Sequence, residues 1–563
     1  MNFLIVAVNA KYIHSNLAVY SLREFAAKNK DSSLNIVEYT INQEYKDILS
    51  SLFSHNPTHI AFSCYIWNIE IINKLVVDIN KILPDVPIWL GGPEVSYSPK
   101  ETVKRLPMIR GVMIGEGEVT FSELVDFYNG NTQGDLEDIA GLYLSEQVGF
   151  SKSRSPISLD ALPFIYDDLN NFEHRILYYE SSRGCPFRCS YCLSSIDKSL
   201  RFRSMDMVKS ELDFFLANNV RQVKFIDRTF NASSARAIEI WEYIHEHDNG
   251  VTNFHFEIAA DILTEAEFEI LSKLRKGQVQ LEIGVQTTNP KTIEAINRKM
   301  DFSKVSIATK RLLMNQNIHL HLDLIAGLPY EDYESFAHSF NDVYNLEPDE
   351  LQLGFLKLLS GTQISRDQDK YNIKASSFAP YEVLSTDWLS YESLLRLKEC
   401  EEVLDLFYNS KQFSCTLKYL QSLFDTSFEF YENLATFFKE NYTYSSSRVP
   451  RFGLLHDFAM KIDPCRMSLY KEALAYDFYL RDNQKSRPSF FREMIKTPEF
   501  NNKIKATLTF EEQSSNRNHH IEPFYYKVWE GSMTQESSPV VIFFDYTNRD
   551  IITNNCYTKV LKY

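Results

Sequence analysis

Three cysteines lie within eight residues of this chain, in the segment SSRGCPFRCSYC that ends at position 192. Thiolates hold iron–sulfur clusters, and a cluster of four irons has four positions to fill. Cys185, Cys189 and Cys192 would therefore leave one iron open to a substrate or cofactor. Gly184 and Pro186 favour a tight, non-helical loop around such a cluster. Because the whole chain has only eight cysteines, this grouping predicts a metal-cluster loop.

The length and composition predict a large globular protein of several domains. The chain has 563 residues, which is longer than a chain that folds around one hydrophobic core. Of these residues 44% are hydrophobic and 24% are charged, as is typical of a globular protein. No segment is typical of a signal peptide or of a helix that crosses a bilayer. The scattered cysteines fit a reducing compartment, so we expect a cytoplasmic protein. The formal net charge of −16 argues against a general nucleic-acid binder.

Strand-like and helix-like segments alternate in the amino-terminal part, which predicts a parallel, doubly wound sheet. The strand candidates are 2–8, 59–64, 86–92 and 109–115. Ligands of such sheets bind at the carboxyl ends of the strands. Ser63, Gly91, Gly92, Glu116 and Gly117 follow these strands, and paired glycines let the backbone approach a bulky ligand. Simple tight turns would explain the same glycines equally well.

The alternation resumes in the central part of the chain. Six strand candidates lie at 176–182, 222–227, 254–260, 279–286, 319–327 and 350–359. Six strand–helix units predict a partial barrel, short of the eight units of a closed one. Asp227, Glu257, Glu282, Gln286 and Asp323 lie at or near the ends of these strands. Any one of them could be structural, but several polar residues at equivalent strand ends predict a site at the barrel mouth.

Several ordered motifs resemble the radical S-adenosylmethionine (radical SAM) superfamily. CxxxCxxC follows the first strand of the expected barrel, with an aromatic residue, Tyr191, before its last cysteine. LEIGVQTTNPKTIEAINR and DLIAGLPYED are similar to later strand motifs of that superfamily. In the amino-terminal part, SCY, LGGPE and GEGEVTFSEL resemble the cobalamin-binding domain that precedes many of its members. The resemblance extends over most of the first two thirds of the chain.

This resemblance implies three cofactors and residues that contact them. The three cysteines would hold a [4Fe–4S] cluster, whose open iron would bind S-adenosylmethionine. An electron from an external donor of the flavodoxin or ferredoxin type would cleave S-adenosylmethionine to a 5′-deoxyadenosyl radical. The implied S-adenosylmethionine contacts are Tyr191, Asp227, Glu257, Glu282, Gln286 and Arg298. The implied contacts of the third cofactor, cobalamin, are Ser63, Gly91, Gly92, Glu116 and Gly117.

One part of the cobalamin-binding signature is missing. The family's Asp-x-His-x-x-Gly segment, whose histidine ligates cobalt, has no counterpart in this sequence. The nearest histidine after the first strand is His14, at a different spacing, and we expect it to be a loop residue. Many members that precede radical domains also lack the histidine, so its absence does not exclude cobalamin.

We expect an α/β protein with five segments. They are a doubly wound, Rossmann-like cobalamin-type domain (1–135), a hairpin and linker (136–170), a partial (β/α)6 barrel of the TIM type (171–375), a mostly helical domain (376–500) and a small β-rich cap (501–563). Within the cap, the pattern KIKATLTFEE predicts a strand over 503–512. The segments beyond 375 resemble an uncharacterised extension on one branch of cobalamin-type radical enzymes.

The leading functional hypothesis is a radical SAM enzyme with cobalamin, acting as a methyltransferase or a related enzyme that functionalises C–H bonds. One alternative is a cobalamin-free radical SAM oxidoreductase that resembles oxygen-independent coproporphyrinogen oxidase. A second is a non-catalytic iron–sulfur protein for electron transfer or sensing, which would normally need a fourth cysteine ligand. Methylthiolation of transfer RNA is disfavoured, because Cys64 stands alone where a second cluster would need three cysteines. We expect a small-molecule, peptide or lipid-like substrate.

Overall fold

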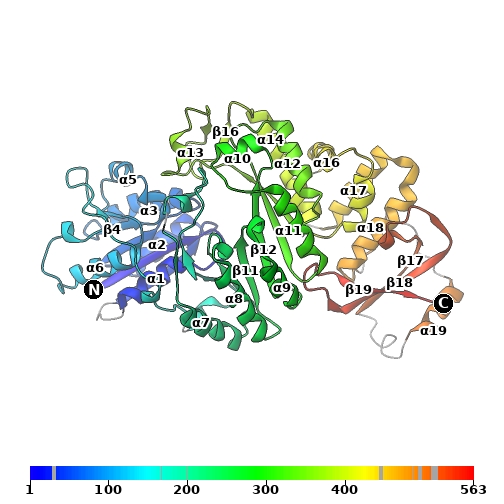
Figure 1. Ribbon diagram of the computed structural model, residues 1–563, viewed down its shortest axis with the longest axis horizontal. Coiled ribbons are helices and arrows are strands. Elements are labelled where there is room, and N and C mark those ends of the chain that lie inside the picture. The colour runs from blue at the N-terminus through cyan, green and yellow to red at the C-terminus, as the bar shows by residue number, and fades with distance from the viewer. Residues whose placement is uncertain are drawn as a thin grey trace.

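In the computed structural model, four parts follow one another along an elongated molecule (Figure 1). A parallel sheet lies at the amino-terminal end, a second parallel sheet occupies the middle, and a helical region and a small antiparallel sheet follow. The structure describes residues 1–27, 33–166, 168–197, 199–442, 448–484, 486–491, 497–508 and 518–562. This arrangement confirms the predicted fold class.

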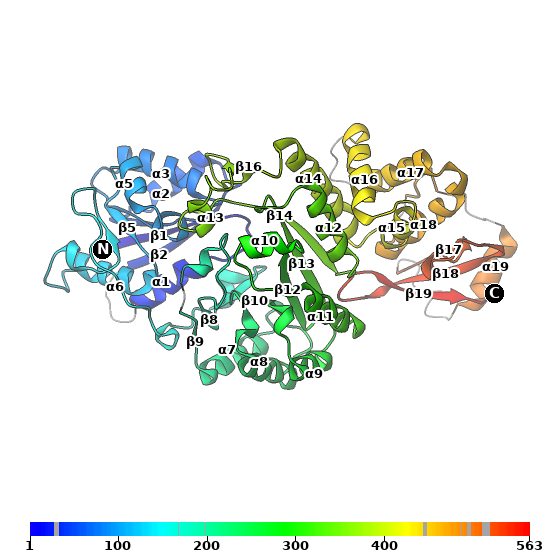
Figure 2. The same ribbon diagram turned by 45° about the horizontal axis from the view of Figure 1, so that its top comes forward.

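The first sheet has the strand order β2-β1-β3-β4-β5-β6, parallel except for β6. Its strands are β1 (Asn2–Asn9), β2 (Ser33–Thr40), β3 (His59–Ser63), β4 (Ile88–Gly91), β5 (Gly111–Met113) and β6 (Leu142–Tyr143). Alternate side chains of β1 point to opposite cores. One core contains α1 (Leu17–Ala27) and α6 (Gly117–Tyr128), and the other contains α2 (Tyr45–Ser54) and α3 (Ile69–Ile82). The carboxyl ends of the central strands all open toward the second sheet (Figure 2).

The second sheet is entirely parallel, with the order β14-β13-β12-β11-β10-β7. Its strands are β7 (Leu177–Tyr179), β10 (Gln222–Phe225), β11 (Asn253–Ile258), β12 (Val279–Gln286), β13 (His319–Ala326) and β14 (Glu350–Phe355). The helices α7 (Met205–Ala217), α8 (Ser234–Glu246), α9 (Glu265–Lys273), α11 (Phe302–Met314) and α12 (Tyr333–Tyr344) alternate with the strands. Along β12 buried apolar residues alternate with partly exposed polar ones. The concave face of this partial barrel is therefore polar and accessible.

The loop after β1 joins the two sheets. The Ile176 N–H donates to the carbonyl of Ile13 at 2.9 Å, and the Ser15 hydroxyl donates to the Ile176 carbonyl at 3.0 Å. His14 Nδ1 lies 2.6 Å from the hydroxyl oxygen of Tyr178 on β7. This loop thus extends the wall of the barrel, and the His14 side chain contacts that wall.

The carboxyl-terminal region begins with a group of helices, of which the π-helix contacts β14 at the edge of the barrel. They are α14 (Tyr391–Val403), a π-helix (Leu404–Asn409), α15 (Ser414–Gln421), α16 (Ser427–Asn441), α17 (Arg448–Ile462) and α18 (Met467–Arg481). The Asn409 side chain accepts a hydrogen bond from the Leu351 N–H at 3.0 Å and donates one to the Leu351 carbonyl at 2.9 Å. It therefore pairs with β14 as a neighbouring strand would.

A small antiparallel sheet ends the chain, with β17 (His519–Tyr526), β18 (Gln535–Arg549) and β19 (Cys556–Leu561) in sequence order. The strand predicted for 503–512 is wrong in its first part, because α19 (Pro498–Thr507) is helical there. Residues 509–512 lie outside the described residues. Among the helices that the structure describes, none is both long enough and apolar enough to cross a membrane.

Candidate active site between the two sheets

The cysteine loop follows β7, and its two ends are paired with each other. A short antiparallel pair, β8 (Ser182–Arg183) with β9 (Arg201–Phe202), joins the two ends of the loop. Gly184 has φ of +100°, and a Cβ there would collide with the carbonyl oxygen of Ser199. Only glycine fits this position, which explains the residue that precedes Cys185.

Neighbouring segments hold the loop through its backbone and one arginine. The Ser190 N–H donates to the Ile296 carbonyl at 2.8 Å, and Asn297 donates to the Arg188 carbonyl at 3.0 Å. Arg298 Nη1 lies 3.6 Å from Cys189 Sγ and 3.1 Å from the Tyr191 hydroxyl oxygen. The loop is thus fixed from the segment that follows β12.

Asp227 anchors the start of the loop. The carboxylate is 1% exposed and accepts hydrogen bonds from the Ser181 N–H at 2.8 Å, the Ser181 hydroxyl at 2.6 Å and the Ser182 hydroxyl at 2.7 Å. Burial raises the pKa of Asp227, although these hydrogen bonds oppose that shift. Both carboxylate oxygens therefore accept hydrogen bonds from the start of the cysteine loop. The sequence motif alone does not predict these hydrogen bonds.

The donor set of the loop fits an iron–sulfur cluster. All three cysteines are free thiols on one restrained loop, with Cys189 buried and the other two partly exposed. In the described part of the chain, no three histidine, cysteine or acidic side chains are placed to hold a single metal ion. A cluster does not require this, since each cysteine binds a different iron.

Charged side chains gather on the concave face of the barrel next to the loop. Glu282 Oε2 lies 3.1 Å from Lys224 Nζ and 3.0 Å from His255 Nε2. Although burial opposes it, the hydrogen bond from His255 and the charge of Lys224 lower the pKa of Glu282 to about 2. Further along the same face, His321 Nε2 lies 2.9 Å from Asp323 Oδ1. Glu282 is thus a paired, ionised carboxylate.

Gln286, at the end of β12, lies in a strained segment. It has φ of +72°, and the register with β13 shifts between Gly284 and Gln286. A Cβ on Gly284 would collide with the Gln286 amide, and the Gly284 carbonyl accepts a hydrogen bond from Arg298. Irregular strands of this kind re-aim side chains at functional sites.

Glu257 differs from its neighbours, because its side-chain carboxyl has no hydrogen bond or ion pair within the described residues. Burial raises its pKa to about 7, with Arg228 opposing and Glu282 assisting the shift. The folded protein therefore favours the protonated carboxyl. The stability that this form contributes is complete below the ordinary pKa of 4.5 and is lost as the pH rises through about 7.

We expect Glu257→Gln to stabilise the cofactor-free protein at pH 8 by on the order of 2 kcal/mol and to have little effect at pH 5. Differential scanning calorimetry at both pH values measures this. Glu282→Gln is the matched control: its carboxylate is ionised at both values, so this variant should lose stability at both. Equal effects of Glu257→Gln at pH 5 and pH 8 would contradict the assignment.

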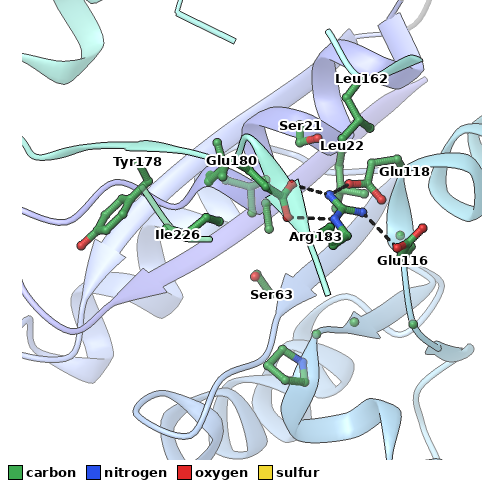
Figure 3. Close-up of a pocket in the computed structure, with 18 of the residues that line it drawn as sticks. Ser21, Leu22, Ser63, Glu116, Glu118, Leu162, Tyr178, Glu180, Arg183 and Ile226 are labelled. Atoms are coloured by element: carbon green, nitrogen blue, oxygen red, sulfur yellow. Dashed lines mark hydrogen bonds and ion pairs between the residues drawn. The ribbon is translucent and has the colours of Figure 1, made fainter. Parts of the chain in front are cut away.

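One cavity of about 510 Å³ lies between the two sheets (Figure 3). All five sequence-predicted cobalamin contacts line it: Ser63, Gly91, Gly92, Glu116 and Gly117. Its opposite wall includes Arg183, Gly184 and Ser194 of the cysteine loop. Four glycines, Gly91, Gly92, Gly115 and Gly117, recur along the first wall, where their backbone can approach a ligand closely. Such a wall suits a large, flat ligand.

Arg183 crosses this cavity and links the two sheets (Figure 3). Its guanidinium lies 2.7 Å from Glu180, 2.8 Å from Glu118 and 3.5 Å from Glu116. Arg201 forms a second ion pair with Glu116. Sequence reasoning placed Glu116 in the site but missed Glu118, Glu180 and the role of Arg183. The GEGE run and the basic residue beside the first cysteine were the available signals.

Three family models match consecutive parts of the chain. They are "B12 binding domain" over residues 4–125, "Radical SAM superfamily" over 179–343 and "Protein of unknown function (DUF4080)" over 369–544. The chain belongs to the radical SAM superfamily. This radical SAM enzyme has an amino-terminal B12-binding domain and a carboxyl-terminal DUF4080 extension, and its cofactors are a [4Fe–4S] cluster, S-adenosylmethionine and cobalamin. These matches favour a radical SAM enzyme with cobalamin over the cobalamin-free and the non-catalytic alternatives.

Curated relatives and solved structures are similar over large parts of this radical SAM enzyme. An uncharacterised methyltransferase of Pyrococcus horikoshii is 25% identical over 57% of this chain and 71% of its own length. The cobalamin-dependent radical SAM methyltransferase TokK of Streptomyces tokunonensis is 25% identical over 50% of this chain and 44% of its own. The cobalamin-dependent radical enzyme OxsB shares the fold, with a TM-score of 0.61 and 16% identity over 84% of this chain and 78% of its own.

Proposed function

We propose that this enzyme transfers a methyl group to a carbon of a small-molecule or peptide substrate. Two observations support the proposal. Two of the relatives at 25% identity carry methyltransferase in their names. In addition, the predicted cobalamin contacts and the cysteine loop line a single cavity. That shared cavity carries the proposal, because a methyl relay needs both cofactors within reach of one substrate.

The residues of the chain have distinct parts in this proposal. Cobalamin bound in this cavity, together with a cluster and S-adenosylmethionine held beside it, would supply the methyl group and the radical chemistry. The three cysteines hold the cluster, and Asp227 holds the loop that carries them. Tyr191, Glu257, Glu282, Gln286 and Arg298 contact S-adenosylmethionine. Ser63, Gly91, Gly92, Glu116 and Gly117 contact cobalamin.

A labelling experiment tests the proposal without knowledge of the substrate. The protein is purified without oxygen, reconstituted with iron and sulfide, loaded with cobalamin and reduced. It is then incubated with S-adenosylmethionine that carries ¹³C in its methyl group. We expect S-adenosylhomocysteine in solution and the ¹³C label in the protein-bound cobalamin fraction, both measured by mass spectrometry.

The control is the same protein without cobalamin, which should form no S-adenosylhomocysteine. Formation of 5′-deoxyadenosine with no label on cobalamin would reject methyl transfer, while leaving the radical SAM chemistry in place. A third outcome is that neither S-adenosylhomocysteine nor 5′-deoxyadenosine forms. If the cluster signal also does not change on addition of S-adenosylmethionine, this outcome would contradict the assigned S-adenosylmethionine site.

A further inference from the structure

A segment between the barrel and the helical region crosses back over both cofactor-binding regions. We call residues 357–385 the strap. It leaves the barrel after β14 and contains α13 (Gln363–Arg366), β15 (Lys374–Ala375) and β16 (Val383–Ser385). In both views α13 and β16 lie at the junction of the first sheet and the barrel (Figures 1 and 2). The strap therefore lies where the two cofactor-binding halves meet.

The strap is bonded to the cysteine loop. The Ile364 N–H donates to the carbonyl of Ser190, between the second and third cysteines, at 2.9 Å. Ile364 is completely buried and Ser190 is 5% exposed, so water cannot replace this hydrogen bond. The Thr362 hydroxyl caps α13 by accepting the Ser365 N–H at 3.3 Å. A buried hydrogen bond thus joins the cysteine loop to the start of the strap.

The strap also holds the loop that follows β4. This loop continues into α4 (Pro93–Ser96), and Pro93, Ser96 and Tyr97 line the cavity. On the other side of α4, the Tyr381 hydroxyl donates a hydrogen bond to the Glu94 carboxylate. Gly361 packs against the ring of Tyr97, because a Cβ there would lie 2.6 Å from Tyr97 Cγ. The strap therefore contacts α4 at Glu94 and also contacts Tyr97, the residue that follows this helix.

We propose that the strap sets the spacing between the cobalamin-binding loop and the cysteine loop, with Gly361 and Tyr381 as positioning residues. The inference rests on the proposed function, since the spacing matters when both cofactors serve one cavity. It also gives the DUF4080 extension a role, because that match begins at residue 369 and includes Tyr381. Tyr381 and Glu94 are 287 positions apart in the sequence.

Gly361→Ala tests the spacing. Gly361 has φ of +87°, and the added methyl group would push the Tyr97 ring toward the cavity. Gly250→Ala is the matched control: Gly250 has φ of +74° with no atom within 4 Å of a Cβ, so it shares the backbone strain without the collision. The readout is the microwave power that half-saturates the EPR signal of bound cob(II)alamin beside the reduced cluster. Relaxation by the cluster depends steeply on the distance between the two centres.

We expect Gly361→Ala to change the half-saturation power at least two-fold, at unchanged iron and cobalamin content, and Gly250→Ala to leave it at the wild-type value. No turnover is needed, so failed methyl transfer would leave this test intact. Equal values for the wild type and both variants would overturn the inference. A change in both variants would do the same, because backbone strain alone would then explain it.

Tyr381→Phe keeps the inference testable if Gly361→Ala does not fold. Loss of the hydrogen bond to Glu94 should weaken cob(II)alamin binding about three- to ten-fold, as measured by anaerobic absorbance titration. The control is Tyr391→Phe, at a tyrosine that is 52% exposed, which should bind as the wild type does. Unchanged affinity of Tyr381→Phe, with the wild-type melting temperature, would contradict the role of the strap.

Discussion

Replacing Cys189 with alanine is expected to give a folded protein that holds no [4Fe–4S] cluster and leaves S-adenosylmethionine uncleaved. Three thiolates on one loop leave only one iron without a protein ligand, and a cluster held by two would be released. The fold should survive the loss of the contact between Cys189 Sγ and Arg298, because hydrogen bonds to the backbone of Ser190 and Arg188 still hold the loop in place. The same result is expected for Cys185 and Cys192.

Iron analysis, the visible absorbance of the reconstituted protein and assay of 5′-deoxyadenosine measure this prediction. Cys465→Ala is the control, because Cys465 is exposed and lies in the helical region. It should retain the wild-type iron content and activity. A full cluster in any one of the three cysteine variants would refute the assignment of that residue as a ligand.

Replacing Arg203 with glutamine is expected to lower the free energy of unfolding of the barrel by about 3–5 kcal/mol, the usual cost of breaking a buried ion pair. The side chains of Arg203 and Glu211 are only 4% and 8% exposed. Arg203 also donates to the carbonyls of Leu159 and Leu162 in the linker, and Glu211 accepts the Tyr179 hydroxyl at 2.6 Å. The variant leaves Glu211 charged, buried and without its cation.

Urea denaturation followed by tryptophan fluorescence measures this effect. Arg311→Gln is the matched control, because it breaks the Arg311–Glu265 pair, in which the glutamate side chain is 84% exposed. Solvent screens such a pair, so a much smaller change is expected. Equal losses in the two variants would show that the burial of Arg203 does not determine its contribution.

Much of the fold could be predicted because the relevant signals are local. Buried strands such as β1 have continuous apolar sequences, and the turns between strand and helix recur at short intervals. β2 was not singled out, because it is an edge strand and most of its side chains are partly exposed. Tertiary context also decides α19, where alternating polar and apolar residues favoured a strand but the chain is helical.

The sequence predicts only those parts of the site whose residues lie close together in one segment. The cysteine loop and the strand-end glycines are local motifs, and the structure brings them to one cavity. The ion pair between Arg183 and Glu118 joins residues 65 positions apart, so no single motif contains both partners. Asp227 was predicted as a contact of S-adenosylmethionine, and its hydrogen bonds to Ser181 and Ser182, which follow β7, join segments that no single motif contains. Contacts of this kind depend on how the domains dock, which sequence patterns do not report.

The pairing of Asn409 with Leu351 has a consequence for how the protein avoids self-association. An open barrel of six strands has two edges, and β14 is at one of them. Free edges expose backbone groups that recruit strands from other molecules and seed aggregates. The Asn409 amide occupies both backbone groups of Leu351, near the start of β14, where a strand of another chain would otherwise pair. In the folded protein the helical extension thus blocks strand pairing at this point of the barrel edge.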